Sequence, residues 1–235
     1  MRQSPDVSRR RFLGYVVAGP TLITGARWID PLATADAQEL PRIGPQIAES
    51  YDLIDFLRDA ARPTANLITV TVEDDGTVSF ELHRTEVGQG INTAIAMIIA
   101  EEMDVPLSQV RITQADARPE LLFNQLTGGS NSIYTIYDPV RIAAAVARQR
   151  LLDAAAIALG SAGAELGILD GVIRAPDGSS LGFGELARDA ASQVTEAVDV
   201  QPKRERPRIV GTPQNRIDAR AMVTGELRYT GDLVV

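Results

Sequence analysis

Two glycines enclose a glutamine directly before an apolar stretch of the sequence. Gly88, Gln89 and Gly90 precede the segment 92–103, whose apolar pattern predicts a helix. Glycine lets the backbone approach a ligand closely and adopt a positive φ. The start of a helix offers unpaired N–H groups and the positive end of the helix dipole, which together favour an anion such as a phosphate. The turn is therefore a candidate ligand site, with the Gln89 amide as both donor and acceptor.

A second loop, Thr-Gly-Gly-Ser-Asn-Ser, repeats this arrangement ahead of another predicted helix. Two glycines allow close approach, and hydroxyl and amide donors follow them. These residues are Gly128, Gly129, Ser130, Asn131 and Ser132. Two such loops could close on one polyphosphorylated or heterocyclic ligand. Short glycine motifs are also common in ordinary strand-to-helix connections, so the residues alone leave both interpretations open.

Other titratable residues favour structural roles. Glu86 invites an acid–base interpretation, as do Glu101 and Glu102. The last two follow an apolar run, which predicts the solvated face of a helix. His83 ends an alternating strand pattern and is more typical of a hydrogen-bonded structural histidine than of a ligand. We assign no catalytic residue and no metal ligand in this sequence.

Composition excludes several kinds of site. The 235 residues contain no cysteine and one histidine. Disulfides, iron–sulfur clusters and multi-histidine metal sites are therefore excluded within this sequence. The formal net charge of -8 disfavours nucleic acid as a partner. If metal chemistry takes place here, a cofactor must carry the metal.

Alternating strand and helix patterns predict an α+β fold. Asp75-Gly76 between two alternating segments is a strong hairpin signal. Residues 201–210 are polar and proline-containing, which predicts a linker before a new domain at 211–235. The other expected elements are a helix at 50–61, a strand at 108–116, a helix from Asp138 to Gly160 with Pro139 near its first turn, and a small hairpin with a short helix at 163–191.

The first 37 residues have the pattern of a targeting segment, and we leave them out of the predicted fold. Arg9 and Arg10 precede an apolar stretch and then small residues, which matches a twin-arginine signal cleaved after Ala37. A basic arm or a membrane anchor is the alternative, although the apolar stretch is too short to span a membrane. The twin-arginine route carries folded proteins, usually loaded with a cofactor, and predicts a periplasmic location.

Longer motifs carry a resemblance to a known family. Residues 86–117, EVGQGINTAIAMIIAEEMDVPLSQVRITQADA, resemble the pterin-binding segment of the molybdenum hydroxylases, the xanthine dehydrogenase family, and Thr93 matches that pattern. The 127–132 loop and the alanine-rich helix after it are similar to the family's second pterin loop. Residues 211–232 resemble the start of its α/β hammerhead domain, with Met222 in place of a lysine.

The order of these segments is unusual for the family. The hammerhead domain precedes the pterin segment in most members but follows it here. This permuted order resembles the isoquinoline 1-oxidoreductase β subunit and its relatives. The resemblance implies a partial molybdopterin-binding domain at 38–200, a linker at 201–210 and the truncated start of a hammerhead domain at 211–235.

The resemblance also implies a cofactor and its binding residues. The cofactor is molybdopterin with molybdenum, commonly as the cytosine dinucleotide. Gln89 would hydrogen-bond the pyranopterin or its phosphate end, and the second loop would bind the dinucleotide. The implied cofactor-binding residues are Gly88, Gln89, Gly90, Thr93, Gly128, Gly129, Ser130, Asn131 and Ser132.

Members of this family hydroxylate N-heteroaromatic rings or oxidise aldehydes with water as the oxygen source. Electrons would pass to a separate small iron–sulfur subunit, with a membrane cytochrome c as a possible acceptor. The family's phenylalanine-containing glycine loop and its late Gly-x-Gly-Glu segment are not found in this sequence, and Glu185 in GFGEL is typical of a first-turn helix residue instead. We therefore expect the N-terminal portion of a large subunit, inactive alone. The alternative is a truncated, catalytically silent cofactor-binding or assembly module.

Overall fold

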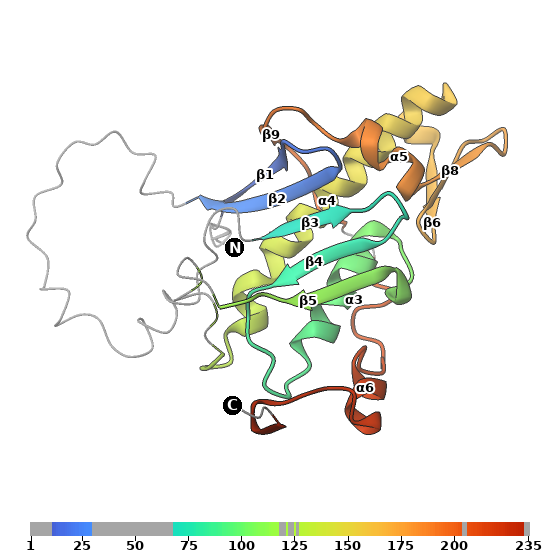
Figure 1. Cartoon of the computed structure of the whole chain (residues 1–235). Coiled ribbons are helices and arrows are strands. Elements are labelled where there is room, and N and C mark those ends of the chain that lie inside the picture. Colours follow the sequence, from blue (N-terminus) through green and yellow to red (C-terminus); the bar gives the residue numbers. More distant parts are fainter. Residues whose placement is uncertain are drawn as a thin grey trace, which may run out of the picture.

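The structure is a computed structural model in which two helices cover one face of a six-stranded sheet (Figure 1). It describes residues 11–29, 68–117, 121, 125, 127–203 and 206–232. The expected helix at 50–61, the arginine pair before residue 11 and the expected cleavage site lie outside this part of the chain. None of the described helices is long and apolar enough to cross a membrane.

The sheet has the strand order β5-β4-β3-β2-β1-β9, and a second sheet has the order β6-β7-β8. The strands are β1 (Arg11–Val17), β2 (Leu22–Ile29), β3 (Thr69–Val72), β4 (Val78–Leu82), β5 (Val110–Gln114), β6 (Gly167–Leu169), β7 (Val172–Arg174), β8 (Ser180–Gly182) and β9 (Glu196–Val198). The helices are α3 (Ile91–Met103), α4 (Ser132–Leu159), α5 (Phe183–Ala190) and α6 (Ala219–Thr224), with 3-10 turns at Leu107–Gln109, Gly163–Glu165 and Thr230–Asp232.

The predicted hairpin is confirmed and leads directly to the glycine turn. Strands β3 and β4 pair antiparallel around Asp75 and Gly76, and Gly76 has a φ of 83°. The Asp75 carboxylate accepts the Thr77 N–H at 2.8 Å, which fixes the turn. Strand β4 then pairs with β5 in parallel, so α3 must cross between them. The glycine turn stands at the start of this crossover.

The structure differs from the expected domain boundary at residue 37. Strand β1 pairs with β2 and β9, and β2 pairs with β3, so residues 11–29 form the middle of the sheet. Val16 and Leu22 are fully buried, and the Thr24 hydroxyl donates to the Ala143 carbonyl of α4 at 2.6 Å. An apolar targeting pattern rich in valine and isoleucine also has high strand propensity, and composition cannot separate the two roles.

Helix α4 begins earlier than expected, at Ser132. Pro139 therefore lies inside the helix and not in its first turn. Proline lacks the N–H that would bond the carbonyl four residues earlier, so the prediction placed the helix start next to it. The expected end is confirmed, because Gly160 caps the helix with a φ of 64°.

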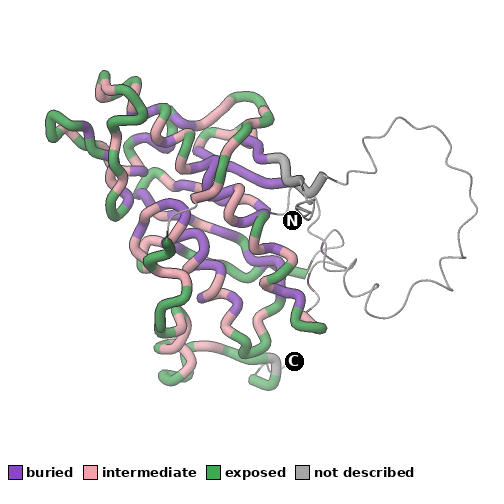
Figure 2. Tube along the Cα trace, turned by 180° about the vertical axis from the view of Figure 1, so that it is seen from behind, coloured by how far each residue is buried: buried purple, intermediate pink, exposed green. Residues whose placement is uncertain are grey.

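The expected small hairpin and short helix after α4 are also confirmed. Strands β7 and β8 pair antiparallel and lead into α5. The Glu185 carboxylate accepts the Gly182 N–H at 2.7 Å, so this residue belongs to the first turn of α5, as predicted. In Figure 2, the buried stretches run along the helices and the strands they cover, whereas no described side chain between 211 and 232 is buried.

Candidate cofactor site

The structure brings the two glycine loops together. The Thr85 carbonyl accepts hydrogen bonds from the Gln89 amide at 3.0 Å and from the Thr127 hydroxyl at 2.6 Å. The Thr85 hydroxyl in turn donates to the Gln125 carbonyl at 2.9 Å. The loop after β4 and the loop before α4 therefore meet at one residue. The two loops are therefore neighbours in the structure, joined through Thr85.

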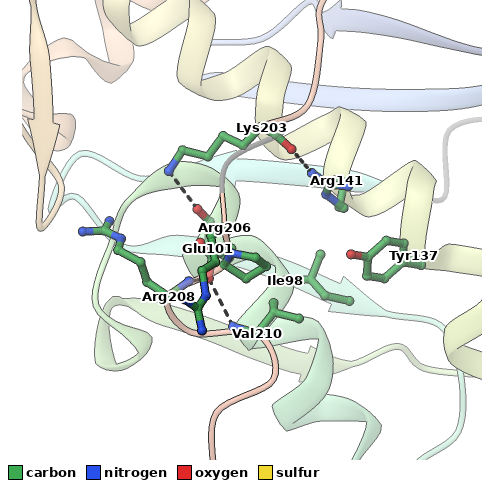
Figure 3. A pocket seen from close by; sticks show the side chains of 9 residues that line it. Ile98, Glu101, Tyr137, Arg141, Lys203, Arg206, Arg208 and Val210 are labelled. Atoms are coloured by element: carbon green, nitrogen blue, oxygen red, sulfur yellow. Dashed lines mark hydrogen bonds between the residues drawn. The ribbon is translucent and has the colours of Figure 1, made fainter.

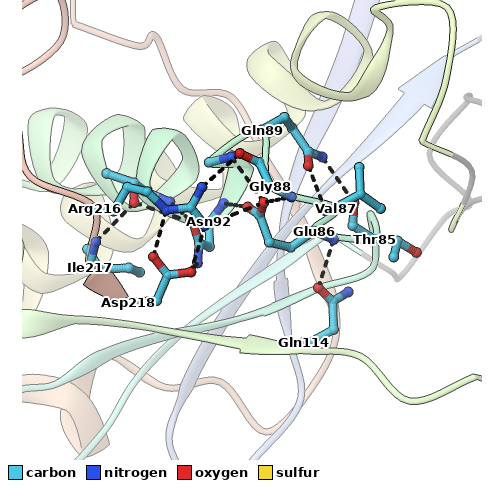
Figure 4. Close-up of polar contacts among 12 residues, drawn as sticks. Thr85, Glu86, Val87, Gly88, Gln89, Asn92, Gln114, Arg216, Ile217 and Asp218 are labelled. Carbon is cyan, nitrogen blue, oxygen red and sulfur yellow. Dashed lines mark hydrogen bonds and ion pairs between the residues drawn. The ribbon is translucent and has the colours of Figure 1, made fainter. Parts of the chain in front are cut away.

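Within the first loop, the Glu86 carboxylate caps helix α3 (Figure 4). One of its oxygens accepts the Gly88 N–H at 2.6 Å and the Gly90 N–H at 3.1 Å, and the other accepts the Asn92 N–H at 3.5 Å. Burial opposes ionisation of this carboxyl, but the three N–H donors and the charge of Arg216 outweigh it and hold its pKa below the usual range. Gly88 and Gly90 have φ values of 106° and 79°, which explains the two glycines.

This arrangement corrects the expected role of the first loop as an open anion site. The N–H groups at the start of α3 already bind Glu86, so an anion would have to displace a side chain of the same turn. The Gln89 amide is also engaged, because its oxygen accepts the Val87 N–H at 2.7 Å and its nitrogen donates to Thr85. An amide has further capacity for one donor and one acceptor contact, which is what Gln89 retains for a ligand.

Arg216 fastens this turn from a distant part of the chain. Its guanidinium donates to the Gly88 carbonyl at 2.9 Å and lies 3.5 Å from the Glu86 carboxylate. Asp218 accepts two hydrogen bonds from Arg216 and one from Asn92, all between 2.8 and 2.9 Å. The bonds from Arg216 hold the pKa of Asp218 at about 2, although burial opposes ionisation.

Thr93 also contacts the 216–218 segment and does not lie on an open surface. Its hydroxyl accepts the Ile217 N–H at 3.1 Å, and the residue is 7% exposed. We expected Thr93 among the cofactor-binding residues. Its hydroxyl contact to Ile217 places it behind the turn, where it supports the shape of the turn.

The second loop resembles the first in its positive backbone angles and in the open space beside a glycine. Gly129 and Ser130 have φ values of 61° and 56°, and a Cβ at Gly128 would meet no atom within 4 Å. Asn131, the N-cap residue of α4, makes no side-chain cap hydrogen bond. The second loop contains no acidic residue of its own, in contrast to Glu86 in the first loop. Asn131 and Ser132 are buried at the base of the loop.

Arg84 adds a buried positive charge below the second loop, and sequence reasoning missed it. Its side chain is fully buried, and it donates to the Thr135 hydroxyl in the first turn of α4 at 3.1 Å. Burial lowers its pKa to about 10, so the guanidinium stays protonated at neutral pH. The alternation of β4, continued two residues past its end at Leu82, could have indicated it, because Arg84 keeps the phase of Phe80 and Leu82.

His83 is buried as expected, but it is not hydrogen-bonded as expected. It is 1% exposed, and neither ring nitrogen has a hydrogen-bond partner among the described residues. Burial, with a smaller contribution from the Arg84 charge, lowers its pKa to about 3, so the ring is neutral. Within the described part of the chain, no group of three or more histidine, cysteine, aspartate or glutamate residues could hold a metal ion.

The opposite end of α3 corrects two further expectations. Glu102 is 1% exposed and not solvated, and it accepts hydrogen bonds from Arg141 at 3.2 Å and from the Lys203 N–H at 2.8 Å. Glu101 accepts three backbone N–H groups, which belong to Arg208, Ile209 and Val210. The expected linker at 201–210 therefore packs along α3, because its backbone donors satisfy these carboxylates (Figure 3).

Comparison with known proteins identifies the family. A family model described as the molybdopterin cofactor-binding domain matches residues 42–218. A nicotinate dehydrogenase subunit of Pseudomonas putida is 35% identical over 212 residues, which cover 84% of this chain and 18% of that protein. The β subunit of isoquinoline 1-oxidoreductase from Brevundimonas diminuta is 33% identical over 156 residues, which cover 64% of this chain and 18% of that protein.

A solved structure, quinoline 2-oxidoreductase from Pseudomonas putida 86, is also similar, with a TM-score of 0.41 and 22% identity over 57% of this chain and 19% of that one. The chain spans 18% of the length of the two curated relatives named above. Because the family model covers most of the chain, including both glycine loops and the Arg216–Asp218 segment, the chain belongs to the molybdopterin cofactor-binding domain family of the molybdenum hydroxylases.

Proposed function

We propose that this chain is the N-terminal portion of the large subunit of a molybdenum hydroxylase, and that its two glycine loops bind molybdopterin, with the phosphate-bearing end at the second loop. The observation that carries the proposal is the contrast between the loops. The first loop is closed by its own Glu86 carboxylate, whereas the second has no acidic residue and its N-cap residue, Asn131, makes no side-chain cap hydrogen bond. A phosphate fits such a helix start, because N–H groups and the helix dipole both favour negative charge.

The neighbouring residues suit an anionic ligand with a heterocycle. Arg84 supplies a buried positive charge one helix turn from the second loop. Ser130 and the backbone N–H groups of Gly128 and Gly129 supply neutral donors. Gln89 supplies one further donor and one acceptor at the facing loop. These residues would bind and orient the cofactor, and the cytosine dinucleotide form is the one we propose.

When bound, molybdopterin supplies a molybdenum centre for two-electron oxidation with water as the oxygen source. We propose an N-heteroaromatic compound or an aldehyde as the substrate of the complete enzyme, in line with the relatives' names. The chain has no cysteine, so an iron–sulfur partner subunit would receive the electrons. A membrane cytochrome c is our proposed acceptor beyond it.

We also propose that the protein is exported to the periplasm by the twin-arginine route. The arginine pair and the apolar stretch behind it support this location. Replacing Arg9 and Arg10 with lysines should leave the protein in the cytoplasm. Unchanged export of that variant, measured by cell fractionation, would refute the assignment.

The cofactor proposal can be tested with two matched glycine substitutions. A Cβ at Gly128 or at Gly163 would meet no protein atom within 4 Å, and Gly163 lies in a 3-10 turn after α4. Gly128→Val and Gly163→Val should therefore leave the folded chain similarly stable. In the complete native complex, we expect Gly128→Val to lower molybdenum and released cytidine nucleotide per chain at least about tenfold, because the ligand needs close backbone approach.

Molybdenum is measured by plasma mass spectrometry and the nucleotide by chromatography after acid release. Gly163→Val should retain both at the level of the unaltered complex. Equal retention in the two variants would contradict a ligand at the second loop. An active native complex without molybdenum would overturn the proposed function itself.

A further inference from the structure

The Glu86–Gly90 turn combines a strained backbone with a charged side chain. Contacts within its own local sequence are not the only ones that hold it. Gly88 and Gly90 both adopt positive φ, which costs backbone entropy in the folded state. The Glu86 carboxylate is partly buried and concentrates negative charge inside the turn. Two further contacts stabilise the turn, namely a cation beside this carboxylate and a donor to the Gly88 carbonyl.

Arg216 makes both contacts with one side chain (Figure 4). Its guanidinium donates to the Gly88 carbonyl at 2.9 Å and pairs with the Glu86 carboxylate at 3.5 Å. It bridges the two arms of the turn from a position 128 residues later in the chain. A rigid fork of donors suits this double contact better than the single ammonium of lysine.

The arginine is itself held in place. Asp218 accepts from its Nε and Nη2 atoms at 2.9 and 2.8 Å, which orients the guanidinium plane. The same carboxylate accepts from the Asn92 side chain at 2.8 Å, in the first turn of α3. Hydrogen bonds to Asp218 and the Glu86 charge raise the pKa of Arg216, so the cation persists at any physiological pH.

We propose that Arg216 is a positioning residue that fixes the Glu86–Gly90 turn in the shape that receives the cofactor. Arg216 would act through Glu86 and the Gly88 carbonyl. Retention of the cofactor thereby depends on a segment that follows the polar stretch 201–210. The consequence for cofactor retention depends on the proposed function, whereas the effect on the turn does not.

The first test measures hydrogen exchange at the turn in the full chain. Arg216→Gln should speed exchange of the Gly88, Gly90 and Asn92 amides about tenfold, because it removes charge-assisted bonds that hold the turn. Arg216→Lys should restore the charge but only part of the protection. Arg220→Gln is the matched control, since Arg220 is exposed on α6. Amides in the middle of α3 should stay protected in every variant, which shows that the fold is intact.

A second test distinguishes a specific contact between Arg216 and Glu86 from a general destabilisation of the turn. Glu86→Gln should also speed exchange at these amides, and adding Arg216→Gln to it should add little, because both substitutions break one contact. Fully additive effects would overturn the proposed bridge. Unchanged exchange in Arg216→Gln would overturn it as well.

The third measurement is molybdenum per chain in the native complex carrying Arg216→Gln. We expect a loss of severalfold that Arg220→Gln does not produce. Normal molybdenum together with faster exchange would overturn the role of Arg216 in cofactor retention. If the unaltered complex contains no molybdenum, the proposed function fails, whereas the exchange data still decide whether Arg216 holds the turn.

Discussion

Helix α3 is held at both ends by the segment from 203 to 218, but the two ends use opposite chemistry. At its N-terminus, Glu86 lies where the helix dipole favours negative charge, and a carboxylate within the same turn satisfies the N–H groups. At its C-terminus, Glu101 and Glu102 lie where the dipole disfavours them. The cap at the start is local, whereas the acidic end depends on cations and donors from distant segments.

The cations at the acidic end come from two parts of the chain. Arg141 and Arg148 reach Glu102 from α4, while Lys203 and Arg208 both pair with Asp104. Arg141 also lies over the Tyr137 ring, 5.6 Å from its centroid. Figure 3 shows Tyr137, Arg141, Lys203 and Arg208 around a small cavity, which Ile98 and Glu101 of α3 also line. We infer that this end becomes stable only when all three segments are in place.

The largest effect on stability should follow from Glu102→Ala, which removes a buried acceptor at the acidic, C-terminal end of α3. It removes the acceptor of the Lys203 N–H and the partner of Arg141 from a buried position. We expect a loss of about 3 kcal/mol in the free energy of unfolding, measured with urea. Glu165→Ala, at an exposed position, should change it by less than about 0.5 kcal/mol. A loss below about 1 kcal/mol for Glu102→Ala would show that other contacts hold this end.

A smaller effect should separate Glu101 from Glu102 by its pH dependence. Burial opposes ionisation of Glu101, but the Ile209, Val210 and Arg208 N–H groups outweigh it and lower its pKa below 4.5. Its contribution is therefore present above pH 4.5 and lost as the pH falls through the lower folded pKa. Glu101→Gln should lower the free energy of unfolding by about 1 kcal/mol at neutral pH. It should also make that free energy less dependent on pH in the acid range.

Glu102 should respond with the opposite sign. Burial raises its pKa above 4.5, so its contribution is present at low pH and lost as the pH rises through the raised folded pKa. Glu102→Gln keeps an acceptor for Lys203 and should cost less than Glu101→Gln at neutral pH. Urea titrations of both variants between pH 3 and 8 measure this difference. Parallel pH curves for the two variants would contradict it.

The smallest effect on stability at neutral pH should come from His83→Phe. This substitution separates the acid sensitivity of His83 from that of Glu86, at the N-terminal end of α3. His83 is neutral and buried, and its pKa is lowered to about 3. Because the folded state disfavours its protonation, His83 reduces stability progressively as the pH falls from 6.5 towards 3. Thermal unfolding of His83→Phe should match the unaltered chain at pH 7 and exceed it at pH 4. The acid sensitivity that remains would then belong to the carboxylates, Glu86 among them.

Local signals predicted much of the fold, and the reason is physical. Asp75-Gly76 and Gly160 require particular backbone conformations, so each marks a turn or a helix end from a few residues. The two glycine loops were expected to be close enough to face one ligand, and Thr85 does hold them side by side. Ligand binding by these loops stays a prediction. Glu101 and Glu102 were expected to be solvated, because an acidic pair after an apolar run usually is, and their partners lie between 39 and 109 residues away in the chain.

Two other features were not predicted, because the same sequence pattern is compatible with more than one structural role. The apolar stretch of β1 and β2 suits an export signal, which needs an apolar core, and also a strand pair, which favours β-branched and aromatic residues. Arg84 continues the buried phase of β4 two residues past its end, yet arginine is rarely fully buried, so the alternation was not extended to it. Arg216 could be found only through its contacts, since nothing in its local sequence points to the Glu86 turn.

The pairing of β1 with β9 makes closure of the sheet a late event in synthesis. The Ala18 N–H donates to the Thr195 hydroxyl, which is 177 residues away in the chain. At about 5–20 residues per second, the ribosome needs roughly ten to forty seconds to bridge that interval. Through this time, β1 and β2 have no finished sheet to join, and any factor that recognises the arginine pair has its opportunity. We therefore expect export and sheet closure to compete for the same residues in time.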